Sequence, residues 1–315
     1  MSNLPQIKNQ GKSRFRNALI EMFNNRQLYF MLLPVVAYFI IFHYYPMYGI
    51  QIAFKDFSIR KGMAASPWVG FEHFQSFFNS YYFTRVIKNT FTISLYSLIA
   101  GFPMPIILAL LMNEVRVSWF KRTVQTITYA PYFISMVVMC AMVTQFLSPD
   151  TGWINKMIES MGGERIYFLG RSEMFSHVYV WSGIWQGTGW SSIIYMAALS
   201  GIDPQLHEAA MIDGAGRLRR IWHINLPGIL PTCIILLIMN CGSILNVGFE
   251  KLFLMQNDLN RSSSEVISTL VYQQGLVQNN YGYSAAVGLF NSLINCTLLI
   301  IVNTIARKTG ETSLW

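Results

Sequence analysis

The sequence predicts an all-α membrane protein with six transmembrane helices. Hydrophobic residues make up 53% of the 315 residues and charged residues only 12%, about half the charged share of an ordinary globular chain. Six stretches contain no Asp, Glu, Lys or Arg, and each exceeds the ~20 residues that a helix needs to cross a bilayer. These stretches are residues 27–54, 89–113, 123–149, 174–202, 221–249 and 266–306.

The first stretch predicts an uncleaved span at about residues 28–50. Residues 1–26 precede it with several basic side chains, and Lys and Arg favour the cytoplasmic side of a membrane. A signal peptide would need a short apolar core and a small-residue cleavage site, whereas this apolar run is long and leads to Pro46. We therefore expect residues 1–26 to be a cytoplasmic N-terminal segment. Its basic residues are Lys8, Lys12, Arg14, Arg16 and Arg26.

The other stretches predict five more spans, so residues 27–315 would form one six-helix transmembrane domain with both termini in the cytoplasm. The cytoplasmic segments of this topology hold thirteen of the 23 Lys and Arg residues, the bias expected of membrane proteins. The long outer segments could form a docking rim for an external partner or be plain connectors. They cover about residues 50–87, 148–176 and 250–283. The five spans cover about residues 89–113, 123–147, 177–200, 228–249 and 283–306.

A polar loop at residues 202–227 separates two apolar stretches and has the features of a docking element. Asp203 can cap the free N–H groups of a helix, and Pro204 is tolerated at the first helical position. Residues at i, i+3, i+4 and i+7 share one helix face. Two alanines make that face thin enough for another protein to approach closely. The face consists of Leu206, Ala209, Ala210 and Asp213.

Gly214 follows this helix, and glycine there allows a sharp turn. A short basic helix at residues 217–220 then leads back into apolar sequence. The loop resembles the EAA loop of ABC importer permeases, whose pattern is EAA, three residues, Gly, nine residues, then Ile-x-Leu-Pro. The matching residues are Glu208, Ala209, Ala210, Gly214, Ile224, Leu226 and Pro227.

Further stretches resemble the carbohydrate-uptake group of these permeases, in particular the LplB-type branch associated with polysaccharide and complex-oligosaccharide uptake. They are residues 45–57, 66–71 and 248–251. The resemblance implies the type I ABC importer permease fold and a multi-pass subunit of the bacterial cytoplasmic membrane. The implied partners are a second homologous permease subunit, two cytoplasmic ATPase subunits and an external solute-binding lipoprotein. The ATPase subunits would bind ATP and Mg. They would dock on the EAA loop, whose docking face includes Asp213.

No catalytic or metal-binding pattern is visible, because the sequence shows no nucleophile–base pair, paired carboxylates or His/Cys set at metal-ligand spacing. The basic residues gather at span ends, which favours membrane orientation over nucleic-acid binding. Ion-coupled transporters usually keep ionisable residues at membrane depth, and the six stretches lack them. A secondary transporter with sodium sites made of carbonyls and hydroxyls is still an alternative. An ABC importer permease for another solute is a further alternative.

The polar groups inside the spans are neutral amides and hydroxyls, which suit an uncharged polyol such as a sugar. Counting the helical rise places several of them near the middle of the membrane. We expect them to line the substrate path, although polar residues also join helices to each other in membranes. The candidates are Gln186, Trp190, Asn240, Ser243, Asn246, Asn291 and Asn295.

Overall fold

The computed structural model describes residues 25–308 and 312–314, and most of these residues lie in helices. The chain divides into two units, residues 1–52 and 53–315, which are treated separately. Of the N-terminal segment predicted at residues 1–26, all but residues 25 and 26 lie outside the described part.

The described part of the first unit is an apolar helical run. It comprises α2 (Arg26–Phe39), a π-helical turn (Ile40–Tyr44), α3 (Tyr45–Met47) and the beginning of a 3-10 helix (Tyr48–Phe54). The π-helical turn ends two residues before Pro46, whose nitrogen has no hydrogen to donate along the helix. The first three elements bury no residue, so their apolar side chains are available to contact lipid.

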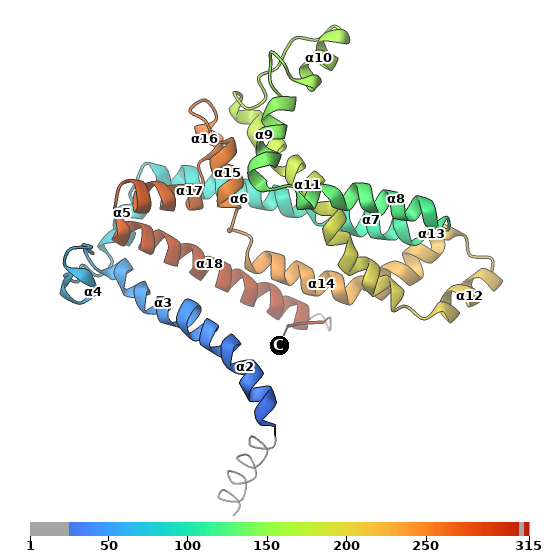
Figure 1. Ribbon diagram of the computed structural model, residues 1–315, viewed down its shortest axis with the longest axis horizontal. Helices are drawn as coiled ribbons and strands as arrows, with labels where there is room; N and C mark the ends of the chain where they lie inside the picture. The colour runs from blue at the N-terminus through green and yellow to red at the C-terminus, as the bar shows by residue number, and fades with distance from the viewer. Residues whose placement is uncertain (1–24, 309–311, 315) are drawn as a thin grey trace, which may run out of the picture. The chain divides into compact units, whose positions relative to one another are not determined.

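The second unit contains all the remaining elements (Figure 1). They are α4 (Gly62–Ala65), α5 (Glu72–Phe78), α6 (Tyr82–Gly101), α7 (Pro103–Asn113), α8 (Ser118–Tyr129), η3 (Ala130–Phe133), α9 (Met136–Phe146), α10 (Trp153–Ser160), α11 (Ser172–Ser200), α12 (Pro204–Ile212), α13 (Arg217–Arg220), η4 (Ile221–Asn225), α14 (Leu226–Gly242), α15 (Phe249–Met255), α16 (Arg261–Ser264), α17 (Ile267–Tyr272), η5 (Gln273–Val277) and α18 (Tyr281–Lys308). Helix α11 packs against α6 and α7, and α14 packs against α18.

Four helical runs in the described residues are long and apolar enough to cross a membrane. They are Arg26–Phe54, Tyr82–Asn113, Arg217–Gly242 and Tyr281–Lys308, and a bent pair, Ser118–Phe133 with Met136–Phe146, would make a fifth. Four or five candidate spans, rather than six, therefore follow from the length and composition of these helices. Helix α11, at the predicted fourth span, has 29 residues, but its many Gly and Ser residues lower its hydropathy.

Two predicted spans differ from the helices that form there. The span expected at 123–147 is broken, because α8 with η3 and α9 meet at a bend of 103°. Pro131 lacks a backbone hydrogen to continue the first helix, and the Ser135 side chain caps the start of α9. The span expected to reach residue 249 ends earlier: α14 stops at Gly242, and a non-helical connection leads to α15.

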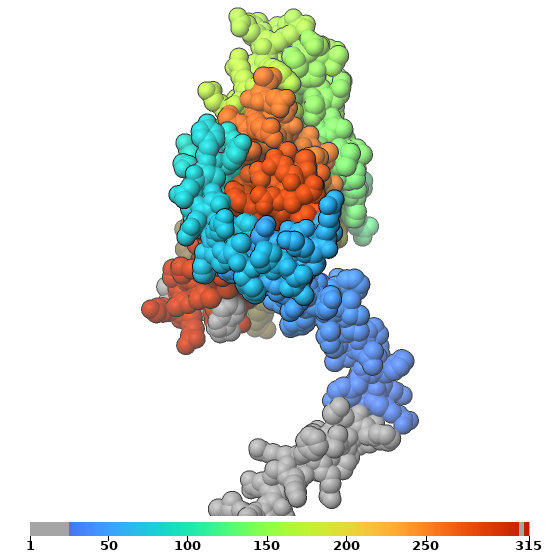
Figure 2. Space-filling model, turned by 90° about the vertical axis from the view of Figure 1, so that its left-hand side faces the viewer, coloured from blue at the N-terminus to red at the C-terminus, as the bar shows by residue number. Residues whose placement is uncertain are grey.

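Three buried apolar clusters hold the second unit together. One joins α6, α9, α11 and α15 around Ile93, Met139 and Leu252. The second joins α5, α6, α17 and α18 around Phe77, and in Figure 2 the orange-red atoms of α17 lie beside the cyan atoms of α6. The third joins α7, α11 and α14 around Ile229. Since α11 belongs to two of the three clusters, it positions the helices that surround the candidate site.

Candidate functional site

Helix α12 lies in the predicted docking loop and starts where the sequence predicts. The Asp203 side chain accepts a hydrogen bond from the backbone N–H of Gln205 at 2.9 Å, and Pro204 occupies the first position. Both residues satisfy or remove N–H groups that a helix start leaves without partners. The local sequence is therefore sufficient to begin a helix immediately after α11.

Helix α12 ends in a Schellman motif, which reverses the chain. The N–H of Ala215 donates to the carbonyl of Ala210 at 2.8 Å, and that of Gly214 donates to Met211 at 3.1 Å. Gly214 has φ of +75°, a left-handed backbone that residues with a side chain adopt at a cost. A basic turn, α13, follows directly. The loop thus turns the chain sharply and is not an extended connector.

No residue of α12 is buried, and the loop carries an unusual amount of uncovered apolar surface. Exposed apolar side chains in a contiguous patch commonly mark a contact with another molecule. Ala209 on the predicted docking face is also exposed, Ala210 on that face is partly exposed, and Glu208 beside it is exposed. The apolar side chains with their exposed fractions are Leu206 54%, Met211 50%, Ile212 87%, Leu218 82% and Trp222 67%.

The loop is connected to the helices at its far end. Helix α13, η4 and α14 form one helical run, in which Ile224 is partly buried and Asn225 is completely buried. The Arg220 guanidinium lies 3.9 Å from the Glu114 carboxylate at the end of α7. A force applied to α12 would therefore reach both α14 and α7.

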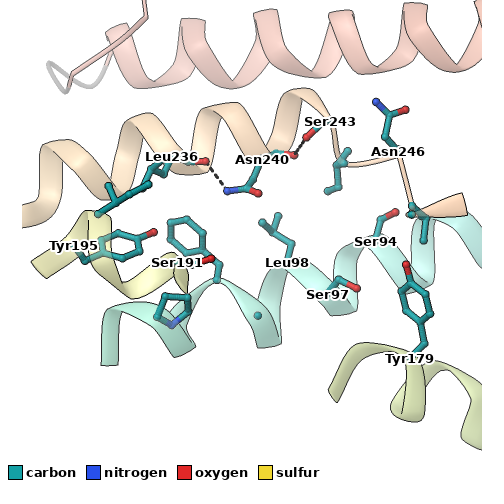
Figure 3. Close-up of a pocket in the computed structure, with 17 residues that line it drawn as sticks. Ser94, Ser97, Leu98, Tyr179, Ser191, Tyr195, Leu236, Asn240, Ser243 and Asn246 are labelled. Atoms are coloured by element: carbon teal, nitrogen blue, oxygen red, sulfur yellow. Dashed lines mark hydrogen bonds between the residues drawn. The ribbon is translucent and has the colours of Figure 1, made fainter. Parts of the chain in front are cut away.

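A cavity of 370 Å³ lies between α6–α7, α11 and α14 (Figure 3). In Figure 3, Ser94 and Ser97 of α6 lie on one side and Asn240 and Ser243 on the other. Hydroxyl and amide groups both donate and accept hydrogen bonds, as the hydroxyls of a sugar do. The polar lining residues are Ser94, Ser97, Tyr179, Ser191, Tyr195, Asn240, Ser243 and Asn246.

The residues predicted to line the substrate path lie in different parts of the structure. Asn240, Ser243 and Asn246 line this cavity together. Gln186 lines a neighbouring cavity and donates to the Ile134 carbonyl at 3.0 Å, across the break between η3 and α9. Trp190 stacks on Tyr132 with ring centroids 4.7 Å apart and lines neither cavity.

Asn291 and Asn295 act between helices. Both donate to the side-chain oxygen of Asn246, at 3.0 Å and 3.1 Å respectively. Asn295 also accepts from the backbone N–H of Leu245 at 3.1 Å. These bonds connect α18 to the non-helical segment after α14, the joining role that polar residues take in membrane proteins. Neither asparagine lines the two cavities.

The neighbouring cavity, of 380 Å³, contains a residue that was not among the sequence candidates. Lys251 lines it from α15 and is only 5% exposed. Its Nζ donates to the Tyr179 carbonyl at 2.5 Å and lies 4.4 Å from the centre of the Tyr179 ring. Helix α15 lies outside the candidate spans, and burial lowers the pKa of the Lys251 ammonium to about 8. Nearby Cys140 opposes that shift.

The sequence candidates omitted Lys251 because it lies just outside the uncharged stretches. Its burial depends on the folding of α15 against α9 and α11, which no local pattern predicts. The only signal in the sequence was its place in the stretch 248–251, which resembles the carbohydrate-uptake permeases. The hydroxyls of Ser94, Ser97 and Ser191 were likewise not singled out.

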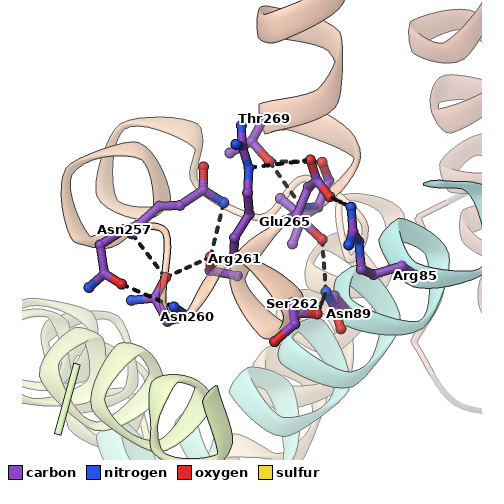
Figure 4. Close-up of polar contacts among 11 residues, drawn as sticks. Arg85, Asn89, Asn257, Asn260, Arg261, Ser262, Glu265 and Thr269 are labelled. Atoms are coloured by element: carbon purple, nitrogen blue, oxygen red, sulfur yellow. Dashed lines mark hydrogen bonds and ion pairs between the residues drawn. The ribbon is translucent and has the colours of Figure 1, made fainter. Parts of the chain in front are cut away.

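A polar network holds the segment that follows α15 (Figure 4). Glu265, 6% exposed, pairs with Arg85 of α6 and lies 3.8 Å from Arg261. The Asn89 side chain donates to the carbonyls of Ser262 and Glu265, each at 2.9 Å. These contacts fix α16 on α6 and so restrain the short helix that carries Lys251.

Three comparisons bear on what this arrangement does. A family model described as "Binding-protein-dependent transport system inner membrane component" matches residues 101–311. Protein LplB of Bacillus subtilis (strain 168) is 46% identical over 92% of both chains. The polygalacturonan/rhamnogalacturonan transport system permease protein YteP of the same strain is 43% identical over 96% of this chain and 95% of its own.

A solved structure is also similar over nearly the whole chain. It is a bacterial ABC transporter involved in the import of the acidic polysaccharide alginate, with 42% identity and a TM-score of 0.86. The match covers 93% of this chain and 99% of that chain. A second structure contains the alginate transporter in complex with an alginate pentasaccharide-bound periplasmic protein, at 41% identity and the same TM-score, covering 93% of this chain and 98% of that chain.

Proposed function

The chain belongs to the family of binding-protein-dependent transport system inner membrane components, and on that premise we propose that it is a permease subunit of an ABC importer for oligosaccharides or polysaccharide fragments. The fold is the type I ABC permease fold of this family, and the family is a transport permease rather than an enzyme. The proposed location is the bacterial cytoplasmic membrane.

The observation that carries this proposal is the uncovered corner formed by α12 and α13. No residue of α12 or α13 is fully buried, yet the corner is built on a precise turn and connected to two membrane helices. Such a surface suits a partner that docks on it and moves it. In the proposed assembly two ATPase subunits, which bind ATP and Mg, occupy the EAA loop of this chain and of a second, homologous permease subunit.

The proposed topology has six spans with both termini in the cytoplasm. Helix α11 would be the fourth span, because 29 residues at ~1.5 Å each exceed the ~30 Å hydrocarbon core. The broken α8–α9 pair would supply the third. This topology places α12 in the cytoplasm and the segments around α10 and α16 outside, where an external solute-binding lipoprotein would dock.

The cavity between α6–α7, α11 and α14 and the neighbouring cavity that Lys251 lines would form part of the sugar path. Gln186, Asn240, Ser243 and Asn246 stay candidates for this role, because they line one cavity or the other. Asn291 and Asn295 would act indirectly, by holding Asn246 in place. Trp190 would take part in the path only where the path extends to η3, whose Tyr132 it stacks on.

The test is uptake by vesicles that contain the complex co-purified from its host. We expect uptake of an oligosaccharide only when ATP is present on the ATPase side. Uptake driven by a proton or sodium gradient without ATP would instead favour the secondary transporter. ATP-driven uptake restricted to a solute other than a saccharide would favour a permease for that solute.

A further inference from the structure

The Lys251 ammonium is a buried charge without a counter-charge in the described chain. Its one hydrogen bond goes to the neutral Tyr179 carbonyl, and its Nζ also lies over the Tyr179 ring. Ion pairs among residues 25–308 and 312–314 involve only arginines, and none reaches Lys251. A buried ammonium without an anion is costly, by several kcal/mol after relaxation. Packing alone would be served equally well by an apolar side chain.

This charge faces a cavity rather than a closed core. Lys251 lines the same cavity as Gln186, Thr188 and Ser191 of α11 and Ser97 of α6. Ser97, Ser191 and Tyr179 also line the first cavity, so the cation lies beside a continuous set of hydroxyl and amide groups. A ligand that matches both the Lys251 cation and the neighbouring hydroxyl and amide groups must carry an anion together with several hydroxyls.

Gly183 leaves the side of the ammonium uncovered. It lies one turn after Tyr179 on the face of α11 that contacts Lys251, and a Cβ there would lie 2.9 Å from the Lys251 Nζ. Any larger side chain would occupy the approach to the cation from this direction. The helix face thus offers a carbonyl and an aromatic ring to the lysine and leaves the remaining N–H groups for a ligand.

We propose that Lys251 binds the carboxylate of a uronic acid unit as the oligosaccharide crosses, so that this permease prefers acidic oligosaccharides. An ammonium pairs with a carboxylate more strongly than with a hydroxyl, and the neighbouring serines and Gln186 would bind the ring hydroxyls. The proposal rests on the proposed function. Alginate and polygalacturonan, after which two of the similar proteins are named, are polymers of uronic acids.

Lys55 supplies a matched control within the same chain. It is also buried, at 4% exposed, donates to a backbone carbonyl (Met63, 2.7 Å) and lies 4.9 Å from the centre of the Trp68 ring. It lines neither of the two cavities. Loss of its charge tests the general cost of altering a buried lysine, without altering the proposed carboxylate site.

The experiment compares uptake of oligogalacturonate with uptake of its methyl ester at equal chain length, in vesicles containing the whole complex. The variants are Lys251→Gln, which removes the charge and keeps an N–H donor, Lys251→Arg, which keeps the charge, and Lys55→Gln. We expect Lys251→Gln to lower the acid-to-ester uptake ratio about tenfold or more. Lys251→Arg should keep the ratio within about threefold, and Lys55→Gln should not change it.

The external binding protein is the same in every vesicle, so a change in the ratio reports on the permease. If Lys251→Gln fails to assemble, Gly183→Ala is measured instead, since it places a methyl group beside an intact lysine. An unchanged ratio in the assembled variant overturns the proposal. Wild-type uptake of neutral oligosaccharides but not of oligogalacturonate also overturns it and leaves the proposed function standing. ATP-driven uptake of no oligosaccharide overturns both.

Discussion

The corner formed by α12 and α13 and the segment that runs from α15 to α16 are both short helices joined by turns, but they are built in opposite ways. No residue of helix α12 is fully buried, and its large apolar side chains are exposed. Helix α15 buries Lys251, Leu252 and Met255, and the segment after it is fixed by hydrogen bonds and ion pairs. The first region is suited to contact with another protein, and the second holds a charged side chain inside this one.

The largest expected effect concerns the turn of the first region. Gly214→Val should abolish ATP-driven uptake or reduce it more than tenfold, because φ of +75° is strained for a β-branched residue. A Cβ at Gly214 meets no atom within 4 Å, so the damage would come from the backbone alone. The measurement is uptake by vesicles together with recovery of the ATPase subunits in a pull-down.

Two controls separate backbone strain from a general effect of losing a glycine. Gly214→Asn should retain most uptake, since asparagine tolerates the left-handed backbone better than valine. Gly216→Ala should be neutral, because Gly216 has an ordinary φ of −69°. Full uptake and full ATPase recovery by Gly214→Val would show that the shape of this turn is not needed for coupling.

The second prediction concerns the segment from α15 to α16, which hydrogen bonds and ion pairs hold in place. Glu265→Gln removes the charge that pairs with Arg85 and Arg261, and it should destabilise the subunit by about 1–3 kcal/mol. The measurement is thermal unfolding of the purified complex in detergent, with Glu159→Gln as the control, since the Arg165–Glu159 pair is about half exposed and surface pairs contribute little. Equal melting temperatures for Glu265→Gln and the wild type would contradict the contrast between the two regions.

The smallest effect is expected at the rim of the docking face. Glu208→Ala should weaken ATPase recovery only slightly and leave thermal stability unchanged, because one exposed charge contributes at most about 1 kcal/mol. The salt dependence of ATPase recovery checks this expectation. A complete loss of recovery would mean that Glu208 is buried in the docked complex and contributes far more than its exposure here suggests.

The same contrast explains what the sequence could predict. The start and end of α12 depend on residues within one or two turns, Asp203, Pro204 and Gly214, so their pattern predicted the helix correctly. The break between η3 and α9 could not be read from apolar composition, which continues across it. The burial of Lys251 depends on contacts between α15 and helices distant in sequence. The neutral side chains expected in the path were therefore only part of the cavity lining.

A cross-link from the docking face tests most directly whether α12 contacts the ATPase. A photoactivatable benzophenone is attached to Ala209→Cys in a variant whose four native cysteines, Cys140, Cys233, Cys241 and Cys296, are replaced by serine. A covalent adduct with the ATPase subunit is expected from Ala209→Cys and none from Ser160→Cys at the end of α10. No ATPase adduct from Ala209→Cys, in a complex that still takes up substrate, would contradict the claim that α12 is the contact through which ATP drives transport.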